Sequence, residues 1–144
     1  MSNLNPTVYT PDLIEQVVSL VAFNSAGLVP AIAQQHDTGE ILMMAWMNAD
    51  ALRETMGTGQ VCYWSRSRAA LWRKGESSGQ AQALVDLRWD CDGDTVLVTV
   101  EQSGVACHTG RRTCFFNAVR NNEIIEIADV EKDPALLYGP KETR

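Results

Sequence analysis

Short apolar runs separated by polar turns recur along this chain and restrict its fold more than any other feature of the sequence. Residues 29–34 and 41–46 flank the polar stretch His36-Asp37-Thr38-Gly39, so they predict an antiparallel hairpin with His36 on the turn. Residues 65–80 are rich in hydroxyl groups, cations and glycine, which is typical of a loop. Further strands are expected at 61–64, 83–89, 95–102, 114–119 and 124–127.

Two helices are expected beside these strands. Thr10 followed by Pro11 is typical of a helix start, and apolar residues continue at helical spacing to about Phe23. Asn48 can cap a second helix over residues 49–56, which Gly57 would end. The sequence therefore predicts a single α+β domain over residues 1–144, mainly of antiparallel strands with two or three helices. Segments 1–10 and 130–144 are expected to be peripheral.

Charge and hydropathy exclude several classes of partner. Twelve Lys and Arg residues against eighteen Asp and Glu residues give a formal net charge of −6, which argues against nucleic acid. No apolar run reaches the roughly 18 residues of a membrane span, and the segment before Thr10 lacks the features of a signal peptide. We expect a cytoplasmic protein that binds no membrane. In that compartment clustered cysteines indicate metal binding or catalysis rather than disulfides.

Two sets of metal ligands lie close together between residues 90 and 114. Hard carboxylate oxygens from Asp90, Asp92 and Asp94 suit Mg²⁺, and soft thiolates from Cys91, Cys107 and Cys114 suit Zn²⁺. If residues 90–94 are extended, the three aspartates share one face and Cys91 points to the other. Three cysteine ligands would leave one zinc position open, which is the pattern of a catalytic site.

Other interpretations of these residues are open. The aspartates could form a solvated acidic turn, and the zinc could be structural with Cys62 or His108 as a fourth ligand. An EF-hand is disfavoured because Thr95 stands where that loop requires glycine. His108 follows Cys107 directly and is the preferred acid/base residue, although a lone histidine is often structural.

The predicted loop over residues 65–80 has the chemistry of a phosphate-binding segment. Arginines, a lysine and hydroxyl groups can hold phosphate oxygens, tryptophans can stack on a base, and Glu76 could orient a ribose hydroxyl. A solvated loop whose arginines pair with surface acids is the alternative. The candidate substrate-binding residues are Ser65, Arg66, Ser67, Arg68, Trp72, Arg73, Lys74 and Glu76, with Trp64 as a second stacking residue.

The order of these motifs closely resembles that of the phosphoribosyl-AMP cyclohydrolase family. The resemblance implies a monofunctional enzyme of L-histidine biosynthesis that hydrolyses the C6–N1 bond in the purine ring of phosphoribosyl-AMP. The product would be the phosphoribosyl-formimino aminoimidazole carboxamide nucleotide. The resemblance covers residues 27–34, 42–48, 63–68, 71–76, 90–94, 101–102, 106–110 and 114–115.

The same resemblance implies the cofactors and the assembly. Asp90, Asp92 and Asp94 match the family's magnesium ligands, and Cys91, Cys107 and Cys114 match its zinc ligands. The family forms an intertwined homodimer whose zinc site takes cysteines from both subunits. Zinc would activate water for attack on C6, with His108 or a neighbouring base taking the proton.

One position departs from the family's pattern. Gln80 stands where relatives commonly have histidine, and an amide can hydrogen bond but cannot shuttle a proton near neutral pH. Two other functions also fit the metal-ligand pattern. One is a non-catalytic module in which zinc clamps a dimer, and the other is a different zinc hydrolase that acts on nucleotides. Turnover of phosphoribosyl-AMP distinguishes the three.

Overall fold

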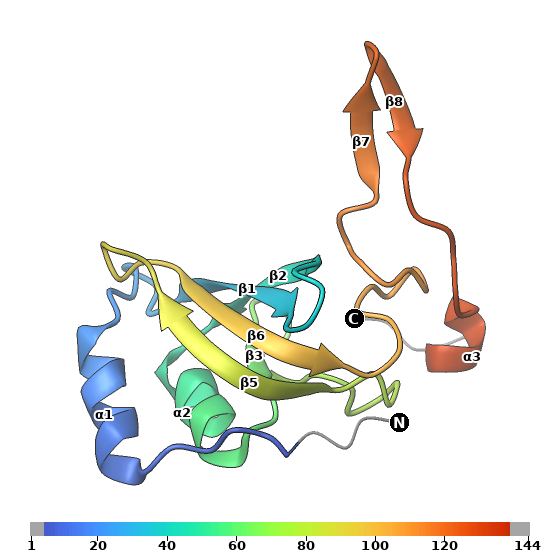
Figure 1. Ribbon diagram of the computed structural model, residues 1–144. Helices are drawn as coiled ribbons and strands as arrows, with labels where there is room; N and C mark the ends of the chain where they lie inside the picture. The colour runs from blue at the N-terminus through green and yellow to red at the C-terminus, as the bar shows by residue number, and fades with distance from the viewer. Residues whose placement is uncertain (1–4, 139–144) are drawn as a thin grey trace.

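A computed structural model describes residues 5–138, and it has the expected α+β architecture with a largely antiparallel sheet (Figure 1). Six strands form one sheet in the order β4-β3-β2-β1-β6-β5, and β7 and β8 form a separate hairpin. The helices are α1 (Pro11–Leu20), α2 (Ala49–Thr58) and α3 (Pro134–Tyr138). The strands are β1 (Val29–Gln35), β2 (Ile41–Met47), β3 (Cys62–Ser65), β4 (Ala70–Arg73), β5 (Gln82–Trp89), β6 (Val96–Gln102), β7 (Asn117–Arg120) and β8 (Glu123–Glu126).

The hairpin predicted around His36 is present. β1 and β2 are antiparallel, with Val29 opposite Met47 and Ala31 opposite Ala45. On its other edge β1 pairs with β6 in parallel, so one strand pair departs from the antiparallel pattern. This pairing places the start of β6 beside Ala31 and its later part beside Gln35.

Helices α1 and α2 cover one face of the sheet, and the main core lies between these helices and the sheet (Figure 1). Fully buried apolar side chains come from β1, β6 and α2, and Ile14 and Val17 join them from α1. Burying a side chain of this size stabilises the fold by roughly 1.5–3 kcal/mol relative to leaving it exposed. None of the helices between residues 5 and 138 combines the length and hydropathy that a membrane span needs.

The second helix begins as predicted but ends later. The Asn48 side chain accepts a hydrogen bond from the backbone N–H of Ala51, as an N-cap does. Gly57 lies inside the helix, and the chain instead leaves it at Gly59, which has a φ of 75°. A residue in the left-handed conformation closes the helix here, and glycine adopts that conformation readily. Gly59, and not Gly57, therefore ends α2.

The expected loop over residues 65–80 contains a strand. β4 pairs with β3, with Tyr63 opposite Trp72 and Ser65 opposite Ala70, so residues 62–73 form a hairpin. The prediction of an uninterrupted loop was therefore wrong for Ala70–Arg73.

The strand expected at 114–119 begins later, at Asn117, because residues 107–114 form a tight loop.

The β7–β8 hairpin projects away from the main sheet as an arm (Figure 1). Asn121 and Asn122 form its turn with φ angles of 52° and 62°, the left-handed values that asparagine tolerates. Val119 is 73% exposed and Ile124 is 83% exposed. These exposed β-branched side chains give the arm an apolar surface.

Candidate active site

The end of the sheet formed by β2, β3 and β4 carries a pocket of about 410 Å³. Its apolar and aromatic walls come from β2 and the β3–β4 hairpin, and its polar side comes from the β3–β4 turn and the Cys107–Cys114 loop. The lining residues are Met43, Met44, Ala45, Trp46, Trp64, Ser65, Arg66, Arg68, Trp72, His108 and Cys114.

Strand register brings the aromatic and cationic residues together. Trp46 of β2 is opposite Trp64 of β3, and the chain then turns through residues 66–69 before β4. The Arg66 guanidinium lies 4.9 Å from the centre of the Trp46 ring, in a cation–π contact. A flat aromatic surface beside guanidinium groups can accept a ligand with an aromatic ring and an anionic group.

His108 and Cys114 reach this pocket because residues 107–114 form a closed loop. The backbone N–H of Cys107 donates to Arg111 O at 3.1 Å, and that of Gly110 donates to Cys107 O at 3.0 Å. The Thr109 hydroxyl lies 3.0 Å from the Cys107 sulfur. Cys107 is buried and Cys114 is half-buried, so both thiols of the predicted zinc pair lie on one short, ordered loop.

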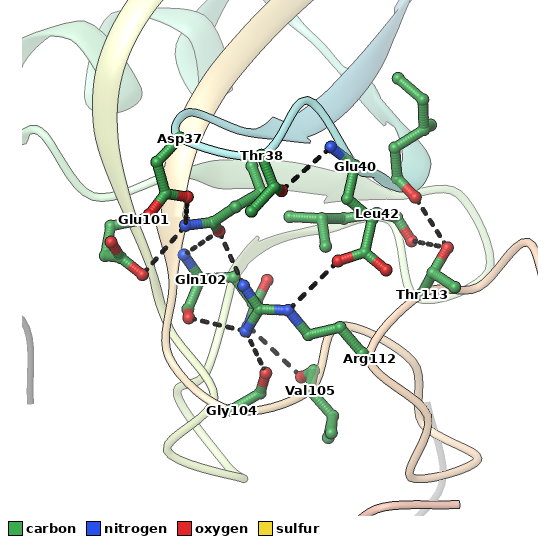
Figure 2. A network of polar contacts seen from close by, with 12 residues as sticks. Asp37, Thr38, Glu40, Leu42, Glu101, Gln102, Gly104, Val105, Arg112 and Thr113 are labelled. Carbon is green, nitrogen blue, oxygen red and sulfur yellow. Dashed lines mark hydrogen bonds and ion pairs between the residues drawn. The ribbon is translucent and has the colours of Figure 1, made fainter. Parts of the chain in front are cut away.

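Backbone and side-chain contacts tie this loop to the sheet. The Cys114 N–H donates to Leu42 O at 2.7 Å, and the Thr113 hydroxyl donates to Ile41 O at 2.7 Å. Arg112 lies at the centre of a polar network in which its guanidinium approaches Glu40 and the end of β6 (Figure 2). The loop that carries Cys114 is therefore held against the first β-hairpin.

The predicted magnesium ligands lie on the β5–β6 turn and are exposed. The expectation of an extended stretch with three aspartates on one face was wrong, because the chain turns tightly here. The Asp90 N–H donates to Thr95 O, and its carboxylate accepts from the Asp94 N–H at 3.0 Å. Gly93 has a φ of 73°, and a side chain there would press on the carbonyl oxygen of Leu20.

Asp90 and Asp94 influence each other's ionisation. Desolvation by neighbouring atoms opposes ionisation of Asp90, but hydrogen bonds with Asp94 and with backbone amides lower its pKa overall. The hydrogen bond with Asp90 and the repulsion between the two charges raise the pKa of Asp94. A bound cation would relieve this repulsion, so the carboxylates are suited to a hard divalent ion.

Cys91 and the other two predicted zinc ligands lie beyond opposite ends of β6. Cys91 precedes this strand, whereas Cys107 and Cys114 follow it, and Figure 1 shows β6 crossing the sheet from one end to the other. Cys62 lies in the core, where burial raises the pKa of its thiol to about 12. It is therefore unsuited to be the fourth zinc ligand that was considered.

The remaining predicted substrate residues are placed differently. Ser67 is exposed on the β3–β4 turn, with its hydroxyl 3.4 Å from that of Ser65. Arg73, Lys74 and Glu76 line a second hollow of about 480 Å³. Arg73 makes two hydrogen bonds with the Glu54 carboxylate, at 2.7 and 2.8 Å, and Lys74 is buried. The structure therefore divides the predicted phosphate-binding set between two surfaces.

Sequence reasoning missed one cluster of ligand-type side chains. Within residues 5–138, only His36, Asp37 and Glu101 place three such atoms within 4.8 Å of one another. His36 Nε2 is 3.0 Å from Glu101 Oε1, and Gln35 donates to both carboxylates. These residues meet through the parallel pairing of β1 and β6, which local patterns do not reveal. Sequence reasoning also missed Met43 and Trp46 of the main pocket, because β2 meets the β3–β4 hairpin through its antiparallel pairing with β3.

The main pocket, with tryptophan rings beside guanidinium groups, is suited to a small ligand that has both aromatic and anionic parts. A family model described as phosphoribosyl-AMP cyclohydrolase matches residues 43–116. A phosphoribosyl-AMP cyclohydrolase from Paramagnetospirillum magneticum is 63% identical over 122 residues, which are 85% of this chain and 92% of that protein. One from Rhodospirillum centenum is 58% identical over 130 residues, which are 90% of this chain and 98% of that protein.

A further relative of the same name, from Halorhodospira halophila, is 60% identical over 86% of this chain and 87% of its own length. Matches this extensive cover both cysteine segments, the aspartate turn and the pocket. The chain belongs to the phosphoribosyl-AMP cyclohydrolase family, and it is a hydrolase.

Proposed function

We propose that this protein hydrolyses the C6–N1 bond in the purine ring of 1-(5-phosphoribosyl)-AMP, a step of L-histidine biosynthesis. The observation that carries the proposal is the pocket where Trp46, Trp64 and Trp72 meet Arg66, Arg68 and His108. The substrate has a purine ring to stack on tryptophan and phosphates to pair with arginine. The relatives' shared name, together with their high identity to this chain, supports the same reaction.

We propose Zn²⁺ as the catalytic cofactor, held by Cys107 and Cys114 together with Cys91. The donor set fits this metal, because all three are free cysteines and two of them lie on the ordered loop beside the pocket. When bound, zinc lowers the pKa of water enough to supply a nucleophile near neutral pH. Free thiols also agree with a cytoplasmic location, where the surroundings are reducing.

The chain's own side chains would then have distinct tasks. His108, on the pocket wall next to Cys107, would take and return the proton of the attacking water. Arg66 and Arg68, with the hydroxyls of Ser65 and Ser67, would hold phosphate oxygens. The tryptophan rings would orient the purine and exclude water from its face.

Mg²⁺ is the second proposed cofactor, with Asp90, Asp92 and Asp94 as its ligands. The turn holds the carboxylates of Asp90 and Asp94 close enough to raise the pKa of Asp94, which is the electrostatic cost that a divalent cation removes. Oxygen ligands on an exposed turn leave room for water or for a phosphate in the coordination shell.

We also propose that the working form is an intertwined homodimer. Cys91 lies beyond one end of β6, whereas Cys107 and Cys114 follow its other end, so a second subunit would have to complete the zinc site. The projecting β7–β8 arm exposes Val119, Ile124 and Ile127, a surface suited to burial against a second copy.

An absorbance assay with phosphoribosyl-AMP tests the function. Turnover that stops with a strong chelator and returns with added Zn²⁺ is the expected result. A zinc-loaded dimer that leaves phosphoribosyl-AMP intact would contradict it and would favour the structural clamp. Hydrolysis of other nucleotides in its place would favour a different zinc hydrolase.

A further inference from the structure

Side chains from outside the segment hold the backbone just before Cys107 and His108, at the peptide group between Gly104 and Val105 and at the one between Ala106 and Cys107. Residues 103–106 belong to no helix or strand, so their backbone groups lack the partners that a regular element provides. The contacts are Arg112 Nη1 to Gly104 O at 2.6 Å (Figure 2), Val105 N to Gln80 Oε1 at 3.0 Å and Lys74 Nζ to Ala106 O at 2.8 Å.

Lys74 stands out among these because it is a cation in a buried place. The residue is only 5% exposed, although its neighbours in sequence suggested an open, phosphate-binding loop. Burying an ammonium group is costly unless its hydrogens are donated to fixed acceptors, and Ala106 O is one such acceptor. An ammonium group already committed to the protein interior is poorly placed to move out to a substrate phosphate.

The position of Lys74 also connects the two parts of the main pocket. Its Nζ lies 5.6 Å from the centre of the Trp72 ring, which forms a pocket wall. Its hydrogen bond to Ala106 fixes the peptide group directly before Cys107 and His108. One buried side chain therefore touches both the stacking surface and the start of the thiol loop.

We propose that Lys74 is a positioning residue that fixes Cys107 and His108 relative to the aromatic wall of the pocket, and not a phosphate contact. Gln80 assists by accepting a hydrogen bond from the Val105 N–H in the same segment. The inference rests on the proposed function. Small displacements of reacting groups reduce catalysis far more than they reduce substrate binding, which makes the role measurable.

Lys74→Met tests the role, because methionine keeps much of the buried apolar chain but removes the ammonium group. We expect kcat to fall by about 10²-fold while KM changes by less than about twofold. We also expect the thiolate absorption band of the Co²⁺-substituted protein to shift, since that band reports the geometry around Cys107. Arg88→Met, which removes a cation from the exposed face of β5, should leave all three quantities unchanged.

Other results would overturn the inference. A raised KM with unchanged kcat would make Lys74 a phosphate contact, and unchanged kinetics and spectrum would leave it no role in the site. If Lys74→Met does not fold, Gln80→Leu frees the adjacent Val105 N–H without removing a charge, and the same loss of kcat and spectral shift are expected. If the wild-type protein does not hydrolyse phosphoribosyl-AMP, the proposed function fails, and the Co²⁺ spectrum alone decides whether Lys74 positions the thiol loop.

Discussion

Mixing two inactive variants should restore activity if each zinc site draws ligands from two subunits. Cys91 precedes β6 and Cys107 follows it, and the seven residues of β6 alone span about 20 Å at roughly 3.3 Å per residue. Two thiolates on one zinc ion lie within about 4.6 Å of each other, twice the usual Zn–S distance. We therefore expect the two ligands of one ion to come from different chains.

The experiment is to express Cys91→Ser and Cys107→Ser separately and then together. Each variant alone should lack zinc-dependent turnover. In a mixed dimer one site combines both mutated positions and the other combines both intact ones, so each mixed dimer has one complete site. With random pairing about half of the dimers are mixed, so turnover and zinc content should return to about a quarter of the wild-type values.

A matched pair provides the control. Cys107 and Cys114 lie on the same loop, so co-expression of Cys107→Ser with Cys114→Ser leaves every site short of a ligand and should restore nothing. The reasoning is refuted if Cys91→Ser with Cys107→Ser also restores nothing while size measurements show that mixed dimers form. It is refuted as well if the two single variants keep their zinc and their turnover.

Three further perturbations test other parts of the site and fold. Arg66→Met removes a charge-assisted hydrogen bond worth about 1.5–3 kcal/mol, so KM for phosphoribosyl-AMP should rise about 10- to 100-fold; an unchanged KM would argue against a phosphate contact. Asp92→Asn should raise the Mg²⁺ concentration needed for half-maximal activity by at least about tenfold, and an unaltered requirement would count against the aspartate site. Burial raises the pKa of Cys62 to about 12 from 9.0, so the folded protein keeps this proton at a pH where the unfolded chain loses it. The stability from this group is therefore complete below pH 9 and declines above it. Between pH 9 and 10 the free energy of unfolding, measured with urea, should fall by about 1 kcal/mol more for the wild type than for Cys62→Val. An equal fall in both proteins would contradict this effect of Cys62 burial.

The sequence alone was sufficient for the elements whose signals are local. The His36 turn between apolar runs predicted the first hairpin, and Asn48 predicted the start of α2, because capping and turn formation depend on neighbouring residues. Part of the predicted site set lines the main pocket, namely Ser65, Arg66, Arg68, Trp72, His108 and Cys114, whereas Arg73, Lys74 and Glu76 line the second hollow.

Other local expectations failed for identifiable physical reasons. β4 was missed because its register with β3, Tyr63 opposite Trp72, outweighs the loop-like composition around it. The aspartates do not alternate along a strand because Gly93 takes a left-handed conformation and Asp90 accepts from the Asp94 N–H.

The sequence by itself determined the chemistry available to this protein: carboxylates, thiols, an adjacent histidine, and arginines interleaved with tryptophans. Only the tertiary structure decided which of these groups share a surface. Arg66 and Lys74 come from the same cationic stretch, yet Arg66 lies on the pocket and Lys74 is buried against Ala106. The reason is that contacts between residues distant in sequence depend on strand register and on the path of the intervening loops, which no local pattern of residues specifies.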